Sequence, residues 1–113
     1  MKRMNEEIIK NFIIKELVQK PDINNWHSIN YGNIDKYLIT PVKRKLVDPV
    51  TNTIEDYWVV LDEDAASESN GYLIIYSENE QSFGIATKKN TQFSNVGTCV
   101  SLYDTFIDAL NAM

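Results

Sequence analysis

The chain has 113 residues, of which 43% are hydrophobic and 24% are charged, and its formal net charge is −5. A length of this order predicts one domain, residues 1–113, and these proportions exclude a disordered or fibrous chain. The single cysteine, Cys99, excludes an intramolecular disulfide and favours a cytoplasmic location. We expect no membrane span, because the longest apolar runs have the length of strands, and no signal peptide, because charges interrupt the N-terminal apolar residues.

The first half of the chain begins with a predicted helix over residues 5–20. Apolar side chains recur there at three- and four-residue spacing, and Pro21 follows. Residues 21–34 are rich in asparagine and are expected to form a loop that Trp26 anchors.

Four strands are predicted next, at residues 36–47, 55–62, 72–77 and 82–88. Pro41 lies within the first of them, which should therefore lie at a sheet edge or bend there, because proline cannot donate to a strand ladder. The last two strands form the clearest hairpin, with residues 78–81 as its loop. In chain order, these segments predict a four-stranded antiparallel meander.

Pairing across this hairpin sets Ile74 opposite Ile85 and Ile75 opposite Gly84, which separates two faces. One face carries Leu73, Ile75, Gly84 and Ala86, and its small residues leave room for a helix. The other face carries Tyr72, Ile74, Tyr76, Phe83 and Ile85. Both faces are apolar, so either helices cover both of them or a partner covers one.

A second helix is predicted over residues 101–112. Ser101 followed by Asp104 resembles a capping box, and apolar residues recur from there at helical spacing. The sequence thus predicts an α+β fold, in which a four-stranded antiparallel meander carries N- and C-terminal helices packed on one face.

Charge is distributed unevenly along the chain. The segment from Leu46 to Thr87 contains no lysine or arginine, whereas its acidic residues are Asp48, Glu55, Asp56, Asp62, Glu63, Asp64, Glu68, Glu78 and Glu80. Such a surface repels phosphate and attracts cations, so we expect a basic protein partner and no direct binding of nucleic acid. The alternative is a solvated acidic face that only maintains solubility.

Residues with catalytic or ligand-binding potential are few. His27 and Cys99 could form a catalytic pair only if the fold brings them together. Asp62 and Asp64 have the spacing of calcium ligands, but the positions that follow them lack the rest of such a loop. The four glycines form no phosphate-binding pattern. We predict no catalytic residue, no metal site, no cofactor and no enzymatic activity. Two protein-binding functions, given below, rank first, and an enzyme or a small-molecule binder is the third alternative.

The hairpin GYLIIYSENEQSFGIATK and the closing segment SLYDTFIDALNAM, with the small size and the acidic middle, resemble the immunity proteins of bacterial polymorphic-toxin and contact-dependent growth inhibition systems. The resemblance covers residues 55–113. It implies a cytoplasmic protein that neutralises a cognate toxin domain, often a nuclease with a basic surface for phosphate. An acidic face on the inhibitor would match that surface and speed the encounter.

The expected partner-binding residues are therefore acids in and around the loop, with aromatic anchors beside them: Asp62, Glu63, Asp64, Glu68, Glu55, Asp56, Glu78, Glu80, Trp58, Tyr72 and Tyr76. The aromatic residue that stays exposed in the free protein is the expected anchor. Because the loop is expected to be solvated, neutralising its four acids should change stability little. The alternative function is an adaptor or regulatory module that forms a homo-oligomer through the aromatic sheet face of Tyr72, Tyr76 and Phe83.

Overall fold

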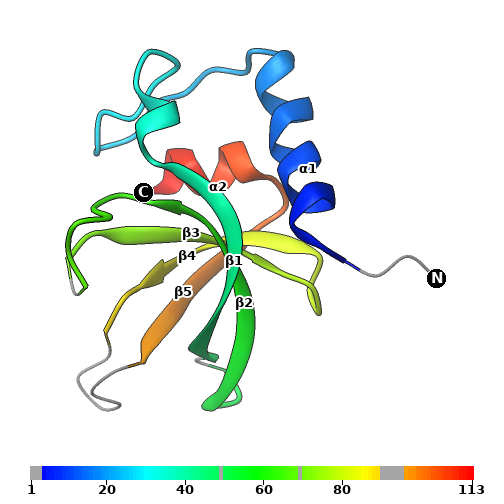
Figure 1. Ribbon diagram of the computed structural model, residues 1–113, viewed down its shortest axis with the longest axis vertical. Helices are drawn as coiled ribbons and strands as arrows, with labels where there is room; N and C mark the ends of the chain where they lie inside the picture. The colour runs from blue at the N-terminus through cyan, green and yellow to red at the C-terminus, as the bar shows by residue number, and fades with distance from the viewer. Residues whose placement is uncertain (1–3, 49, 69, 90–95) are drawn as a thin grey trace.

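Five strands form a small closed barrel, and two helices pack against its outside (Figure 1). The computed structural model describes residues 4–48, 50–68, 70–89 and 96–113. Its elements are α1 (Glu6–Val18), the 3-10 helix η1 (Ile34–Lys36), β1 (Leu38–Asp48), β2 (Thr53–Asp62), β3 (Tyr72–Ser77), β4 (Ser82–Thr87), β5 (Gly97–Tyr103) and α2 (Phe106–Ala112). Successive strands pair antiparallel, and a short parallel pairing of β1 with β5 closes the barrel. The α+β class is confirmed, whereas the meander has a fifth strand that we did not predict.

The fifth strand takes residues that we expected to begin the second helix. The N-cap of α2 is Thr105, whose hydroxyl accepts a hydrogen bond from the backbone N–H of Asp108 at 3.0 Å. The predicted capping box at Ser101 is therefore wrong. Pairing with β4 satisfies the backbone groups on one side of the residues from Thr98 to Tyr103, and this long-range gain overrides the local helical pattern.

The long first strand runs through Pro41. Its pairing with β2 shifts register between Leu38 and Val42, and Figure 1 shows the strand curving across the barrel. The predicted bend at this proline agrees with that irregularity.

The central hairpin of β3 and β4 has the predicted register, with Ile74 opposite Ile85 and Ile75 opposite Gly84. We expected a helix against the face of Leu73, Ile75, Gly84 and Ala86. This is wrong, because that face lines the interior of the barrel. A side chain at Gly84 would meet Leu102 Cδ2 at 2.7 Å, so strand β5 rather than a helix uses the space. The interior cluster consists of Leu46, Tyr57, Val59, Leu73, Ile75, Ala86 and Cys99.

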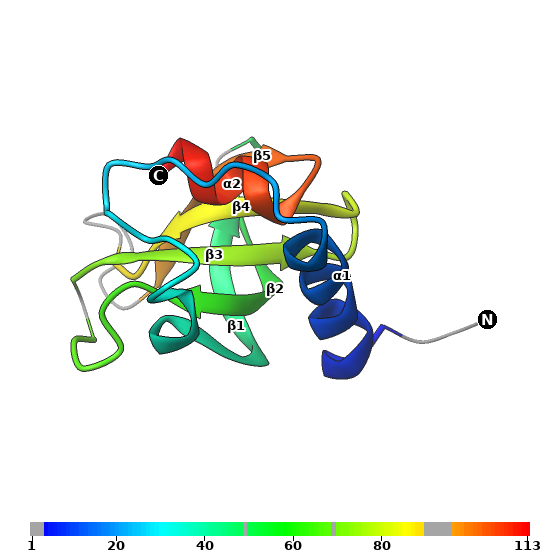
Figure 2. The same ribbon diagram turned by 90° about the horizontal axis from the view of Figure 1, so that it is seen from above.

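Both helices cover the opposite, outward face of the hairpin, including Tyr76 and Phe83 (Figure 2). The carboxylate of Glu16, in α1, joins the two helices: it accepts hydrogen bonds from the backbone N–H groups of Phe106 and Ile107, each at 3.0 Å. These two groups are among the donors that the start of a helix leaves without a partner. In the part of the chain that the structure describes, no helix has the length and apolar character to cross a membrane.

Candidate functional site

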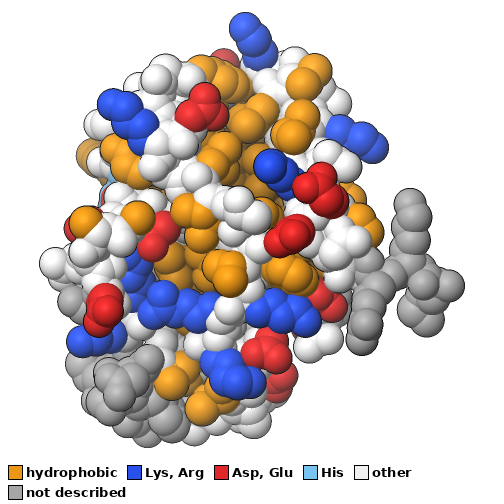
Figure 3. Space-filling view, viewed as in Figure 1, with side chains coloured by type: hydrophobic (Ala, Val, Ile, Leu, Met, Phe, Trp, Pro, Cys, Tyr) orange, Lys and Arg blue, Asp and Glu red, His pale blue; other side chains and the backbone are white. Residues whose placement is uncertain are grey.

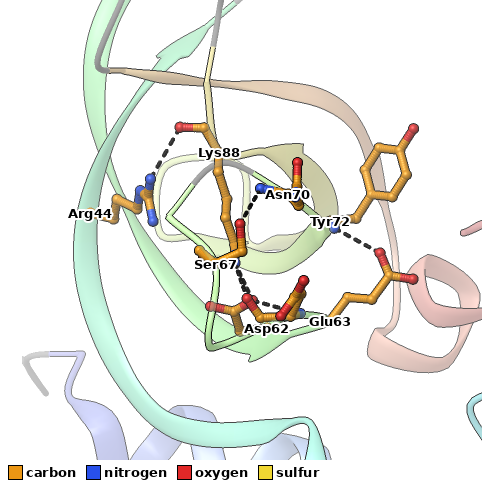
Figure 4. A network of polar contacts seen from close by, with 8 residues as sticks. Arg44, Asp62, Glu63, Ser67, Asn70, Tyr72 and Lys88 are labelled. Atoms are coloured by element: carbon orange, nitrogen blue, oxygen red, sulfur yellow. Dashed lines mark hydrogen bonds and ion pairs between the residues drawn. The ribbon is translucent and has the colours of Figure 1, made fainter.

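The acidic loop between β2 and β3 is folded around the side chain of Lys88 (Figure 4). The Lys88 Nζ atom lies 2.7 Å from Asp62 Oδ1, and it donates to the carbonyl oxygens of Asp64 and Ser67 at 2.6 and 2.7 Å. Lysine is rarely removed from water without such partners, and Lys88 is only 1% exposed. The expectation that the loop is simply solvated is therefore wrong for Asp62, which holds a buried cation.

Glu63 is also engaged within the protein. One carboxylate oxygen accepts from the backbone N–H of Tyr72 at 2.9 Å, and the other pairs with Nδ1 of His27. The His27 ring packs edge-on against Tyr72, with 5.5 Å between ring centroids. Glu63 thus ties the asparagine-rich loop to β3, and His27 contacts it rather than Cys99. Among the four predicted loop acids, Asp64 and Glu68 are exposed.

The three predicted aromatic anchors differ in exposure. Tyr76 is 4% exposed beneath the helices and is not available to a partner. Trp58 is half-buried; its Nε1 donates to Glu78 at 2.5 Å, and Lys43 Nζ lies 5.3 Å from its ring centroid. Tyr72 is 40% exposed and is the predicted anchor that the fold leaves at the surface.

Trp26 is a surface residue that we missed. Its backbone N–H donates to the carbonyl of Met113, while its side chain is 94% exposed, so it does not anchor its loop as expected. Asn25 does so instead, because its side-chain oxygen accepts from the backbone N–H groups of His27 and Ile29. The indole of Trp26 borders a shallow hollow of about 350 Å³ together with Tyr72.

A second hollow, of about 530 Å³, opens at the end of the barrel where β1 turns into β2 and β3 turns into β4. We call it the acidic hollow. Its acidic lining residues are Asp48, Glu55, Asp56 and Glu80; its apolar ones are Val50, Val100 and Leu102; Tyr57 and Cys99 reach it from the barrel interior. Val50 and Val100 are both exposed, so negative charge and accessible apolar surface lie side by side.

The acids that line this hollow differ in the ion pairs and hydrogen bonds that their carboxylates form. Asp56 pairs with Lys45 at 3.2 Å between exposed atoms, a contact of small energetic value. The carboxylate of Glu55 accepts from the hydroxyl of Thr53 at 3.0 Å. Within the described residues, no basic side chain forms an ion pair with Glu55 or Glu80.

Burial and the nearby carboxylates shift the pKa values of the two groups at the base of the hollow, the Tyr57 hydroxyl and the Cys99 thiol. Burial raises the pKa of the Tyr57 hydroxyl, and the carboxylates of Asp48 and Glu55 raise it further. Burial also raises the pKa of the Cys99 thiol to about 11. A thiol in this state is not a nucleophile near neutral pH, so Cys99 acts as a core residue.

A run of basic residues lies on β1 beside the hollow, and one of them, Lys45, pairs with Asp56. Lys43, Arg44 and Lys45 are consecutive on this strand, and Figure 3 shows a band of lysine and arginine side chains across the face that β1 crosses. The guanidinium of Arg44 donates to the carbonyl of Lys88 at 3.1 Å. The polarity of the sequence thus becomes a basic band on one strand and an acidic hollow at one end of the barrel.

Comparison of the chain with family models, with curated proteins and with solved structures finds no match. A function must therefore be inferred from the charge, the exposure and the shape of this surface.

Proposed function

We propose that this protein is an immunity protein, which binds a basic toxin domain through the acidic hollow and its surroundings and thereby neutralises it in the cytoplasm. One observation carries the proposal: Glu55 and Glu80 line the hollow beside exposed Val50 and Val100, without an ion pair to any described basic residue. Fixed carboxylates next to exposed apolar side chains are complementary to a cationic protein surface in both charge and contact.

The resemblance to immunity proteins supplies the class of partner. A nuclease toxin needs a basic surface to hold phosphate, and an acidic protein seated on that surface excludes the nucleic acid. Rim carboxylates mainly accelerate the encounter, whereas a few aromatic residues provide most of the binding energy. We assign the first role to Glu55, Glu80 and the exposed loop acids, and the second to Tyr72 and Trp26.

The alternative function, self-association through the aromatic sheet face, has less support. Tyr76 and Phe83 are each 4% exposed and pack beneath the helices of the same chain. Two copies could meet there only if α1 and α2 moved away. Two chains that each carry a net charge of −5 also repel one another at long range.

The proposal is tested with the protein encoded directly upstream in the native operon. We expect that protein to arrest growth when produced alone, and co-production of the present chain to restore growth and to yield a co-purifying complex. The double variant Glu55→Gln/Glu80→Gln should protect less well, whereas Glu6→Gln/Glu7→Gln, two exposed acids of α1, should protect fully. Absence of both a complex and protection would refute the function.

A further inference from the structure

In the part of the chain that the structure describes, one edge of strand β5 is largely without a strand partner. It pairs with β4 from Thr98 to Tyr103, but with β1 only through Leu46 opposite Gly97 and Val47 opposite Thr98. Strand β1 ends one residue later, at Asp48. Over residues 99–103, no other described strand pairs with this edge, and no described loop residue forms a backbone hydrogen bond with it. Alternate residues of a strand direct their N–H and C=O groups to each side, so some of the backbone groups of this stretch face away from β4.

The unpaired stretch borders the acidic hollow. Leu102 lies on the interior side of the barrel, next to Gly84 and Ile75, and is nevertheless 39% exposed; among the described residues, β1 pairs with β5 only at Gly97 and Thr98. Val100 is 55% exposed. Edge strands are usually protected by lysine, proline or a covering element, and the sequence GTCVSLY contains neither charge nor proline.

The geometry points to β-strand addition: we propose that the edge of β5 from Cys99 to Tyr103 receives an extended segment of the partner, with lysine or arginine at alternate positions, as an additional strand. The segment's backbone would pair with β5, and its basic side chains would face Glu55 and Glu80 across the hollow. The inference rests on the proposed function, because the toxin domain supplies the segment.

A basic segment fits this edge better than a second copy of the chain. Two identical edges would bring together two sets of the same hollow acids, and like charges directly apposed oppose such pairing. A cationic strand gains the same backbone hydrogen bonds without that repulsion.

The first test uses the full chain and a capped hexapeptide, Lys-Val-Lys-Val-Lys-Val, observed by NMR. We expect peptide-induced shifts at the amides of residues 99–103 and in the lining of the hollow. A peptide with the same side chains but N-methylated at alternate backbone positions keeps the charge and loses the donors of one edge. Two such peptides cover the two edges: the one methylated on the edge that pairs with β5 should bind about tenfold more weakly or worse, and the one methylated on the outer edge should bind like the unmodified peptide.

The second test changes the chain. Val100→Lys places a like charge at the edge and should weaken binding of the unmodified peptide about tenfold or more. Val18→Lys is the matched control, because Val18 is 73% exposed at the end of α1, and it should bind like the wild type. Because Val100 is exposed, the variant should keep the wild-type circular dichroism and melting temperature.

Each outcome decides the inference. Binding of both N-methylated peptides as tight as that of the unmodified peptide, peptide-induced shifts elsewhere on the chain, or wild-type affinity of Val100→Lys for the unmodified peptide would overturn it. A dimer seen by sedimentation and abolished by Val100→Lys would also overturn it, in favour of a second copy. If the upstream toxin is neutralised equally by Val100→Lys, the edge is wrong and the function stands; if the peptide adds to β5 but the toxin is not neutralised, the function is wrong.

Discussion

At the scale of the residue, Lys88 is the side chain on which the acidic loop depends. Its ammonium group contacts one carboxylate and two carbonyl oxygens while almost fully removed from solvent. Removing one member of a buried ion pair leaves the other charge uncompensated, which costs more than the pair itself contributes. Lys88→Met should therefore lower the free energy of unfolding by about 2–4 kcal/mol, measured by urea denaturation.

The neighbouring residue provides the control for this prediction. Lys89 is exposed, and Lys89→Met removes the same charge from the chain, so the free energy of unfolding should change by less than about 0.5 kcal/mol. Equal stability of the two variants would show that the buried contacts of Lys88 contribute nothing.

The hairpin register already indicated that Lys88 lies beside the acidic loop, although the distribution of charge along the chain does not show it. The hairpin register sets Thr87 opposite Tyr72, so residue 88 continues the strand beside the end of the acidic loop. The segment without basic residues ends at Thr87, and folding returns the next residue to that loop. No local pattern predicts that the Trp26 side chain is exposed. Its exposure depends on the loop conformation, which Asn25 holds by accepting hydrogen bonds from the backbone N–H groups of His27 and Ile29.

Cys99 allows a second prediction at this scale. Its pKa of about 11 lies above that of a free thiol, about 8.5, so the native state holds its proton more tightly than the unfolded chain does. At pH 8 only about one native thiol in 1,000 is ionised, against about one in four in the unfolded chain, so iodoacetamide should react about 200-fold more slowly than with the urea-unfolded protein.

The same shift has a defined sign for stability. The unfolded chain releases the Cys99 proton first, so this group's contribution to the free energy of unfolding is fully present below pH about 8.5 and is lost as pH rises toward about 11. Complete alkylation of the native protein within the time needed for the unfolded one would contradict the buried placement of the thiol.

At the scale of the element, α2 is held by a residue far away in sequence. A helix of this length is marginal alone, and the carboxylate of Glu16 satisfies two N–H groups at its start. Glu16→Ala should lower the free energy of unfolding by about 1–2 kcal/mol and increase amide hydrogen exchange in α2. Lys15→Ala, on the exposed side of α1, should do neither. Unchanged exchange in α2 of Glu16→Ala would contradict the capping role.

The hairpin and the first helix could be predicted because their signals are local, namely alternation around a short turn and helical periodicity before Pro21. Strand β5 could not, because Tyr103 also fits the apolar stripe of the helix that follows. Closure of the barrel could not be predicted either, because it depends on the pairing of Leu46 with Gly97, which are far apart in the sequence and share no local pattern.

At the scale of the whole molecule, the fold converts a charge asymmetry along the chain into one in space. Strand β1 carries consecutive basic residues, whereas Glu55, near the start of β2, and Glu80, in the turn between β3 and β4, line the acidic hollow. The overall acidity follows from the sequence, whereas the class of partner stays a prediction. Which acids are free could not be inferred from the sequence, because Asp62 and Glu63 are occupied by Lys88 and His27 through contacts that only the fold creates.

The central claim, that the acidic hollow captures a basic partner, is tested most directly by the association rate of the chain with the upstream-encoded toxin domain, measured by stopped flow as ionic strength rises from about 20 to about 500 mM. We predict that the wild-type rate falls about tenfold or more over this range, and that Glu55→Gln/Glu80→Gln is slower at low salt and less dependent on it. Glu6→Gln/Glu7→Gln has the same net charge as that variant and should behave like the wild type. A Glu55→Gln/Glu80→Gln variant that associates at the wild-type rate, with the wild-type salt dependence, would contradict the account.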